Sequence, residues 1–411
     1  MSSGNKRVGI IGGSIAGCAA AIAFSRAGYR VEVYERSSRG LNDRGSGIAL
    51  PMPLRNSLVE ADYLPREYPV CPLRMRWWQY HDGTPIGRRL WSQPTPTAAS
   101  NNWGMLWRAL RARVDDACYH EGKQLAGFDE MTDHVQARFA DGTTERFDLL
   151  VGADGYHSAV RNKLHPHVQP EFAGYILWRG NYPEDELQDR SYLDAMDADN
   201  AWLTVPFQGG HGVMYPIPNF DSRTDPGHRR VNWAIYAPVP DALDLNSVES
   251  IPPGALTPEV YQALLDLLAA DFPEKIAELF RHSRRQEVSI QPIFDSVVDT
   301  YVSDRTLLIG DAGTMTRPHT ASGATKALED ALALERLAKT TPDMGALLEA
   351  YDQERAGVAK TMSGLGQRIG RAQVLQTPDW ATMGPAEFGH WIEATLAGDT
   401  LYLYGEPDEA A

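Results

Sequence analysis

Three short turns rich in glycine contain the residues whose types and spacing are best suited to chemistry. The first turn, residues 12–17, reads GGSIAG and follows the pattern G-x-G-x-x-G except that Ser14 stands at the second glycine position. Such a turn brings backbone N–H groups and a helix N-terminus toward a pyrophosphate, and serine is small enough to allow that approach. Glu35 follows Gly17 by 18 residues, where an acidic side chain accepts hydrogen bonds from ribose hydroxyls. The turn therefore predicts a dinucleotide site.

Two later turns repeat the combination of an apolar strand with a glycine and an aspartate. One is Asp154-Gly155, and the other is Gly310-Asp311, which leads through Pro318 into a helix. An aspartate at such a place accepts hydrogen bonds from cofactor hydroxyls, and amides at a helix start stabilise negative charge. A tight turn with a capping aspartate explains each motif equally well, so both interpretations stay open.

Candidate catalytic side chains lie at the third turn and in aromatic-rich segments that precede it in the chain. His319 follows Pro318 directly, and an imidazole there can accept the proton of a substrate hydroxyl, although a structural histidine is the alternative. Arg179, His211 and Tyr215 are weaker candidates of the same kind. Aromatic residues of these stretches could line a pocket, but at strand spacing they are more often core: Trp77, Trp78, Tyr80, Trp178, Trp202, Tyr215 and Trp233.

The elements that must position these residues begin with one strand, helix and strand unit. Apolar residues 8–11 indicate a buried parallel strand, residues 16–27 a helix of small residues that ends at Gly28, and residues 31–34 a second strand. Residues 134–155 predict two strands joined by a turn at Asp141-Gly142 and running into the second glycine turn. The unit predicts a nucleotide-binding α/β domain.

The middle of the chain has a different character. Residues 73–91 and 201–219 are rich in aromatic residues, alternate in polarity and turn at Asp82-Gly83 and Gly209-Gly210, which predicts an antiparallel sheet.

Residues 343–374 predict a helix, and the GLGQRIG segment at 364–370 is interpreted as glycines packed within it, because no strand precedes it. We expect a discontinuous nucleotide domain (1–72, 100–175 and 285–340), an inserted substrate-binding sheet domain (73–99 and 176–284) and a C-terminal helical region (341–411).

Composition narrows the classes of partner. The chain has 411 residues with 39 basic and 54 acidic side chains, and a net charge of −15 would repel a phosphate backbone, so nucleic acid is excluded as a partner. Cys18, Cys71 and Cys118 show neither metal-site nor disulfide spacing, so we expect no metal. The first strand leaves no room for a signal peptide and no apolar run is long enough for a membrane span, so we expect a cytoplasmic protein without a membrane partner.

In their order and spacing the three turns resemble those of the class A FAD-dependent aromatic hydroxylases, the p-hydroxybenzoate hydroxylase group. The resemblance runs from about residue 6 to about residue 370. Specific to it are Asp154-Gly155 with Ser158 and Arg161, and Gly310-Asp311 with Pro318. The segments GGSIAG, GSGIAL, AGYILWRGNYPE, YPIPN and RPHTASGATKALEDA resemble the branch of 2,6-dihydroxypyridine 3-hydroxylases. The resemblance implies a Rossmann-like FAD-binding domain with an inserted antiparallel sheet and C-terminal helices.

Site residues are carried over from the resemblance by position. The chain departs from the commoner class pattern at Ala321, where glycine is usual, at Thr325, where asparagine is usual, and at Trp107, where arginine is usual. Arg108 is the neighbouring candidate to replace that arginine. The resemblance implies that the cofactor is bound by Gly12, Gly13, Ser14, Ile15, Ala16, Gly17, Glu35, Arg36, Arg44, Gly45, Ser46, Gly47, Arg108, Asp154, Asp311, Pro318, Ser322, Gly323 and Ala324.

The resemblance also implies a reaction. NADH or NADPH reduces the FAD, dioxygen adds to the flavin, and an electron-rich ring carbon of a small aromatic or N-heterocyclic substrate takes one oxygen from the hydroperoxide. A homodimer is a further expectation. Alternatives on the same fold are an oxidase, a reductase or a halogenase, the last kept open by Lys326, and outside catalysis a module that only binds FAD.

Overall fold

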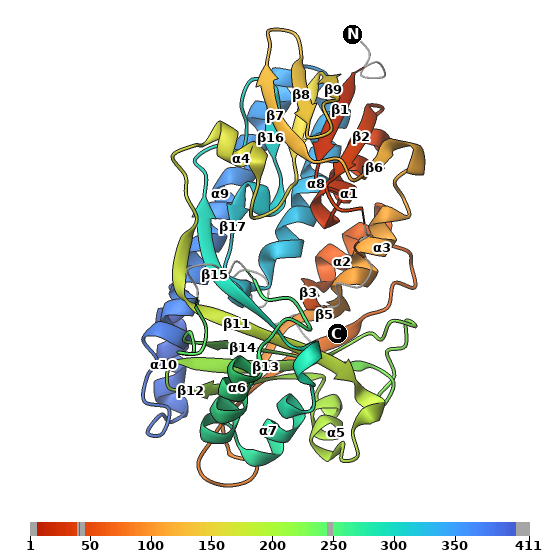
Figure 1. Cartoon of the computed structure of the whole chain (residues 1–411). Helices are drawn as coiled ribbons and strands as arrows, with labels where there is room; N and C mark the ends of the chain where they lie inside the picture. Colours follow the sequence, from red (N-terminus) through yellow and green to blue (C-terminus); the bar gives the residue numbers. More distant parts are fainter. Residues whose placement is uncertain (1–5, 39–40, 42–45, 245–249, 400–411) are drawn as a thin grey trace.

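A five-stranded parallel sheet forms the nucleotide-binding half of the molecule. The computed structural model describes residues 6–38, 41, 46–244 and 250–399, so Arg44 and Gly45 lie outside the described residues. This sheet lies in the upper part of Figure 1. Its strands run in the order β16-β10-β1-β2-β6, and each neighbouring pair is parallel. Their bounds are β1 (Arg7–Ile11), β2 (Arg30–Glu35), β6 (Tyr119–Glu121), β10 (Leu149–Gly152) and β16 (Thr306–Leu308).

The first strand, helix and strand are close to the predicted ranges. Helix α1 (Ile15–Arg26) is almost entirely buried, because β1 lies on one side of it and α8 (Ser322–Thr340) packs against it on the other. Its alanines allow this close approach of two helices. Gly28 adopts a φ of 86°, which lets the chain turn sharply into β2. The sequence therefore predicted this unit correctly.

A nine-stranded sheet forms the other half and occupies the lower part of Figure 1. Neighbouring strands are antiparallel throughout, except that β12 pairs with β4 in parallel. The predicted turns at Asp82-Gly83 and Gly209-Gly210 join β4 to β5 and β12 to β13. In order, the strands are β17 (Thr314–Met315), β15 (Ser289–Val297), β11 (Glu171–Pro183), β14 (Arg230–Ala237), β13 (Gly210–Ile217), β12 (Ala201–Phe207), β4 (Cys71–Tyr80), β5 (Arg88–Asn102) and β3 (Gly47–Pro51).

Alternation along these strands separates a core face from a cavity face. Trp178 and Trp233 lie on the core face, where they pack in one hydrophobic cluster with the helices α6 (Pro258–Asp271) and α7 (Glu274–Arg281). Their chain neighbours Arg179 and Asn232 point to the opposite face, where they line a cavity. Of the seven aromatic residues considered from the sequence, only Trp202 and Tyr215 line that cavity. The others, Trp77, Trp78, Tyr80, Trp178 and Trp233, pack in hydrophobic clusters. Trp78 and Tyr80 share a strand face with Arg76, but Trp380 and Phe388 cover that part of the face.

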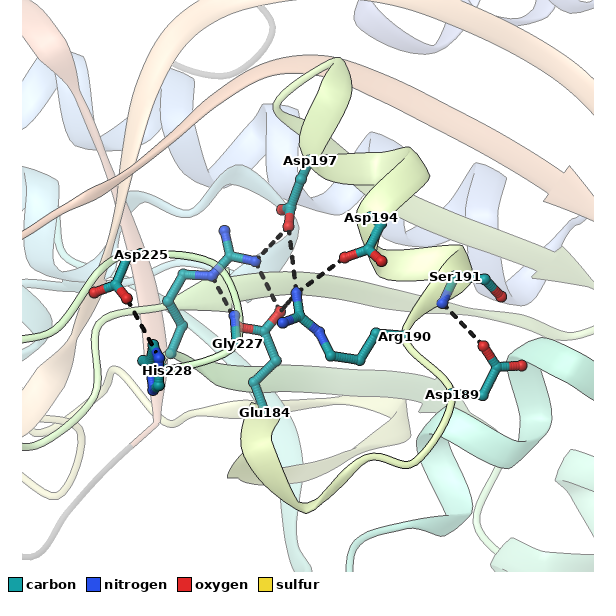
Figure 2. A network of polar contacts seen from close by, with 10 residues as sticks. Glu184, Asp189, Arg190, Ser191, Asp194, Asp197, Asp225, Gly227 and His228 are labelled. Carbon is teal, nitrogen blue, oxygen red and sulfur yellow. Dashed lines mark hydrogen bonds and ion pairs between the residues drawn. The ribbon is translucent and has the colours of Figure 1, made fainter.

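A buried ion network lies where β11 ends and β14 begins (Figure 2). The Arg229 guanidinium donates to Glu184 at 2.8 and 3.1 Å and to Asp197 at 2.7 Å, while Arg190 lies 3.2 Å from Glu184. Glu184 is only 1% exposed, and the two arginines keep the pKa of its carboxyl low against the effect of burial. The network joins α5 (Ser191–Ala198) to the sheet. It lies behind Tyr215, since both line one small void.

The remaining elements cover the two sheets. The predicted turn at Asp141-Gly142 joins β8 to β9 in a small three-stranded sheet. The single strand predicted to run on into the second glycine turn is instead two strands, β9 and β10, which belong to different sheets. The GLGQRIG segment lies inside α9, as predicted, and residues 371–375 continue it as one π-helical turn. Within the described residues no helix is both long and apolar enough to cross a membrane. Further bounds are β7 (Leu125–Glu130), β8 (Val135–Phe139), β9 (Thr144–Phe147), α2 (Met52–Glu60), α3 (Trp103–Arg111), α4 (Ala159–Leu164), α9 (Met344–Gly370) and α10 (Pro385–Leu396).

The expected domain boundaries divide the sequence differently from the sheets. All five parallel strands fall within the ranges expected for the nucleotide domain. Strands β3, β15 and β17 also fall in those ranges, yet they form hydrogen bonds within the nine-stranded sheet. Segments expected in the nucleotide domain therefore contribute strands to both sheets, and β3 is one of those found in the nine-stranded sheet.

Candidate active site

One cavity of about 580 Å³ extends from the carboxyl ends of β1, β2 and β10 to the inner face of the nine-stranded sheet. Ligands of parallel α/β sheets bind at this end of the strands, where loops and helix N-termini meet. The lining changes along the cavity from glycine turns and carboxylates to arginine, imidazole and phenol side chains. The cavity therefore has two ends of different chemistry.

The first glycine turn forms the floor of one end. Gly12 has a φ of +101°, and a Cβ on Gly17 would lie 1.8 Å from the Gly12 carbonyl oxygen. Both positions therefore require glycine. Ser14 is the N-cap residue of α1, makes no side-chain capping bond and lines the cavity. A larger residue at the turn would fill the space that a diphosphate needs.

The peptide of Gly13 is held from three sides. Its N–H donates to Glu35 Oε2 at 2.8 Å, and its carbonyl accepts from Trp107 Nε1 and Tyr119 Oη, both at 2.9 Å. Trp107, which stands where the class pattern has arginine, therefore supports the turn from behind. Arg108 is exposed and does not line the cavity, so the structure does not bring it to the site.

The second turn matches both interpretations proposed from sequence. The Asp154 carboxylate accepts from Ser158 Oγ at 2.5 Å and from the Ala159 N–H at 2.7 Å, so it caps α4. Asp154 also lines the cavity, and burial raises the pKa of its carboxyl. Arg161, 1% exposed, donates to the carbonyls of Tyr156 at 2.7 Å and Asp311 at 3.4 Å. This arginine ties the second turn to the third.

The third turn presents an aspartate to the cavity and keeps a lysine out of it. Asp311 lines the cavity with its side chain 46% exposed, and its Oδ1 lies 4.0 Å from Lys326 Nζ. Lys326 is fully buried and donates to the carbonyls of Gly310 at 2.5 Å and Thr314 at 2.6 Å. These contacts make Lys326 a support for the turn, which removes the sequence basis for a halogenase lysine.

Helix α8 begins at the cavity wall. Ala321, the N-cap residue, has a left-handed φ of 54°, a conformation that favours the glycine of the class pattern. Pro318, Gly323 and Ala324 line the cavity, whereas Ser322 is buried and bonds to Thr316 and Thr320. Backbone amides of the helix start therefore approach the cavity through small residues.

Gly47 joins the two ends. Its N–H donates to Asn232 Oδ1 at 2.8 Å, and its carbonyl accepts from Arg179 Nη2 at 3.1 Å. Both side chains come from the nine-stranded sheet and line the cavity beside Tyr215. Ser46 does not line the cavity, and its carbonyl accepts from the N–H of Trp103 at 3.0 Å. Arg179 thus binds a backbone carbonyl. Asn232 is a cavity residue that the sequence did not reveal.

Two imidazoles and a tyrosine form the opposite end. The His319 ring stacks on Tyr236 with centroids 4.1 Å apart, and His211 stacks on the same tyrosine at 4.6 Å. Burial, with the neighbouring charge of Arg76, lowers the pKa of His211 to about 3, and burial holds the pKa of His319 well below its usual value. Both rings are therefore neutral at physiological pH.

Arg76 is the cation that sequence reasoning missed. It lines the cavity with its guanidinium carbon 4.2 and 4.3 Å from the ring centroids of Trp78 and Trp202, and its Nε donates to Thr204 Oγ1 at 3.0 Å. Two aromatic faces hold such a planar group in one orientation. The signal in the sequence was an arginine that alternates with aromatic residues on β4, which strand spacing alone does not distinguish from a surface charge.

Most predicted site residues thus meet in one place. Of the candidate cofactor residues, Gly13, Gly17, Ser46, Arg108 and Ser322 do not line the cavity, and Arg44 and Gly45 are outside the described residues. The glycine cradle and the adjoining carboxylates suit a dinucleotide. The residues that line the cavity and were expected from sequence are Gly12, Ser14, Ile15, Ala16, Glu35, Arg36, Gly47, Asp154, Arg179, His211, Tyr215, Asp311, Pro318, His319, Gly323 and Ala324.

Comparison with known proteins agrees with this geometry. A family model described as "FAD binding domain" matches residues 257–364. The 2,6-dihydroxypyridine 3-monooxygenase of Paenarthrobacter nicotinovorans is 31% identical over 360 residues, covering 86% of this chain and 87% of that protein. Salicylate hydroxylase of Pseudomonas putida is 27% identical, covering 90% and 87%.

A solved structure extends the agreement to the fold. The 2,6-dihydroxypyridine-3-hydroxylase from Arthrobacter nicotinovorans superposes with a TM-score of 0.79 at 26% identity, covering 92% of this chain and 96% of that chain. Sequence, fold and the cavity with its glycine cradle lead to one assignment. The chain belongs to the class A FAD-dependent aromatic hydroxylases, the p-hydroxybenzoate hydroxylase group, and is an FAD-dependent monooxygenase that uses NADH or NADPH as co-substrate.

Proposed function

We propose that the substrate is a hydroxypyridine or a closely similar hydroxylated N-heterocycle, bound with a ring oxygen toward the end of the cavity formed by Arg76, His211 and His319. The single observation that carries this proposal is that a buried cation and two neutral imidazoles line that end together. Such groups favour the deprotonated ring, which is the more nucleophilic form. The relatives named for 2,6-dihydroxypyridine and salicylate act on ring systems of this chemistry.

We further propose how the chain holds its cofactor. The turn from Gly12 to Gly17 and the side chain of Glu35 bind the ADP part, while Asp154, Asp311 and the start of α8 lie along the flavin part. When bound and reduced, FAD activates dioxygen for transfer of one oxygen atom to the substrate. The protein orients the substrate ring, stabilises its deprotonated form beside the Arg76 cation and excludes water from the cavity.

The test is oxygen incorporation. The purified holoenzyme is given NADH or NADPH, ¹⁸O-labelled dioxygen and a panel containing 2,6-dihydroxypyridine, 6-hydroxynicotinate and salicylate. We expect a dihydroxylated or trihydroxylated pyridine product that carries one labelled oxygen, with faster NAD(P)H oxidation when substrate is present. Labelled product from salicylate alone would contradict the pyridine assignment. Hydrogen peroxide as the sole product across the panel would contradict hydroxylation of these substrates.

Two expectations about the whole protein also stay predictions. Cytoplasmic location is tested by fractionating the source cells, and a homodimer by sedimentation of the purified holoenzyme. A protein recovered in the membrane or secreted fraction would contradict the first, and a sedimentation mass near 45.4 kDa would contradict the second.

A further inference from the structure

Tyr175 lies behind His319 in a chain of buried polar groups. Its Oη is 2.7 Å from His319 Nε2, and Arg317 Nη1 donates to the same oxygen at 3.4 Å. Arg317 is itself fixed by Asp295, to which its Nε donates at 2.8 Å and its Nη2 at 2.6 Å. The tyrosine is fully buried and does not line the cavity. It can therefore act on a substrate only through His319.

The direction of these hydrogen bonds follows from the donors available. Arginine has no acceptor atom, so Tyr175 Oη must be the acceptor toward Arg317. The phenol has one hydrogen, and the nearest acceptor for it is His319 Nε2. Burial and the charges of Arg317 and Arg76 keep His319 neutral, so the ring carries one hydrogen. With Nε2 accepting, that hydrogen belongs to Nδ1.

Helix α9 supplies the space for this contact at Gly370. A Cβ at that position would lie 2.3 Å from Tyr175 Oη, 2.9 Å from Arg317 Nη1 and 3.1 Å from His319 Nε2. Gly370 is the last residue of the GLGQRIG segment, which lies within the helix. The glycine is required because the tyrosine hydroxyl and the imidazole nitrogen meet against the helix backbone.

His211 is held through its other ring nitrogen, by a backbone carbonyl that lies three residues after Gly370. Its Nδ1 lies 3.4 Å from the carbonyl oxygen of Gln373, in the π-helical turn that follows α9. A carbonyl only accepts, so Nδ1 carries the hydrogen of this neutral ring and Nε2 is an acceptor. The end of α9 therefore contacts both imidazoles but uses different nitrogens of the two rings.

We propose that Tyr175, held by Arg317 and seated on Gly370, is a positioning residue that fixes His319 as the tautomer with hydrogen on Nδ1. In this form neither ring nitrogen of His319 accepts the substrate proton, because Nε2 accepts from Tyr175 and Nδ1 carries the hydrogen and is buried, in contrast to the role predicted from sequence. A substrate ring bound beside His319 then loses its hydroxyl proton to a group other than this imidazole. Only this last statement rests on the proposed function, because the tautomer is a property of the enzyme without substrate.

The tautomer is measured directly by NMR of the FAD-loaded enzyme labelled with ¹⁵N-histidine. The two ring nitrogens of a neutral histidine resonate in separate regions according to which one carries hydrogen, and comparison with a His319→Gln sample assigns the His319 signals. We expect protonated Nδ1 and unprotonated Nε2 in the wild type. Tyr175→Phe should mix the two tautomers, and Gly370→Ala should do the same by displacing the hydroxyl. Tyr182→Phe, a buried tyrosine of the same strand that does not line the cavity, is the matched control and should change nothing.

Binding of a hydroxypyridine to the resting enzyme gives a second reading. In Tyr175→Phe the His319 ring that lines the cavity is no longer held in one position by a hydrogen bond, so binding should weaken about tenfold. Protonated Nε2 in the wild type, or an unchanged tautomer in Tyr175→Phe, would overturn the proposal. If the tautomer is found as expected but no pyridine is hydroxylated, the proposed function fails and the tautomer proposal stands.

Discussion

The two ends of the cavity are built in different ways. The end proposed for FAD, called the FAD end below, is formed by turns and helix starts, and its decisive contacts run to backbone atoms, as in the peptide of Gly13. The end proposed for the substrate is formed mainly by side chains that project from strands β4, β11, β12, β13 and β14, together with His319 from the turn before α8. A backbone cradle tolerates few substitutions and binds one cofactor, whereas side chains on strands can be exchanged singly. The contrast explains how one fold keeps its cofactor while its substrates differ.

The largest effect is expected from breaking the FAD end at Gly17. In Gly17→Ala the new methyl group would overlap the Gly12 carbonyl oxygen, 1.8 Å away. The obstacle is a backbone atom, which cannot move aside as a flexible side chain can. Overpacking costs about 1–3 kcal/mol even where neighbours can shift, so we expect a protein that retains little FAD. The measurement is flavin absorbance per protein after gel filtration. Gly357→Ala, where nothing lies within 4 Å, is the control, and full FAD content in Gly17→Ala would contradict the assignment.

The next effect concerns the substrate end. His211→Gln removes the imidazole whose unprotonated Nε2 is placed to accept a hydrogen bond from the substrate hydroxyl and so to orient the ring, and hydroxylation should slow on the order of 100-fold. The flavin content should stay at the wild-type level, since His211 lies at the opposite end from the glycine turn. Product formation and flavin absorbance are measured on the same samples, with the exposed His390→Gln as control. Loss of FAD in His211→Gln would show that the two ends are not independent.

Glu35 offers a smaller perturbation of the FAD end. Its carboxylate accepts from Gly13 N–H and from Ser37 N–H, both at 2.8 Å, and lines the cavity where ribose hydroxyls are expected. Glu35→Ala should weaken FAD binding by about 1–3 kcal/mol, because hydrogen bonds to a charged group are lost. Titration of the apoprotein with FAD gives the dissociation constant. Glu32→Ala, on the same strand but outside the cavity, is the control, and an unchanged constant in Glu35→Ala would remove Glu35 from the site.

The smallest effect is expected at Ala321. This alanine has a left-handed φ of 54°, which costs a residue with a side chain about 1–2 kcal/mol, while glycine loses about 0.5–1 kcal/mol of that gain through its greater freedom when unfolded. Ala321→Gly should therefore raise the free energy of unfolding by less than about 1.5 kcal/mol. Thermal unfolding of the holoenzyme checks this. A clear loss of stability would mean that the Ala321 methyl group contributes packing that glycine lacks.

The meeting of the glycine turn with Glu35 could be predicted from the sequence because its signals are local. Gly12, Gly17 and Glu35 lie in one strand, helix and strand unit, and their spacing alone implies their meeting. Asp154 and Asp311 were recognisable by the same pattern. Arg108 was a candidate only because Trp107 broke the pattern, and nothing in the sequence shows that the indole reaches a backbone carbonyl.

The substrate end was only partly predictable because it is assembled across the sheet. Arg76, Tyr175 and Asn232 lie on three strands whose neighbours are fixed only by long-range pairing. Alternation indicates that half the residues of a strand share a face, but it does not say which face is the cavity. Trp178 and Arg179 illustrate this, since adjacent residues serve the core and the site.

The order of strands in the parallel sheet has a consequence for synthesis of the protein. Strand β16, residues Thr306–Leu308, closes one edge against β10, and α8 then covers the buried face of α1. A ribosome releases these segments long after β1 and α1 have emerged, so the first apolar unit must wait for its partners. Nonlocal pairing of this kind slows folding and leaves apolar surface exposed to aggregation. Chains truncated before residue 306 should therefore need chaperones to stay dispersed, and the cradle for FAD can be completed only near the end of translation.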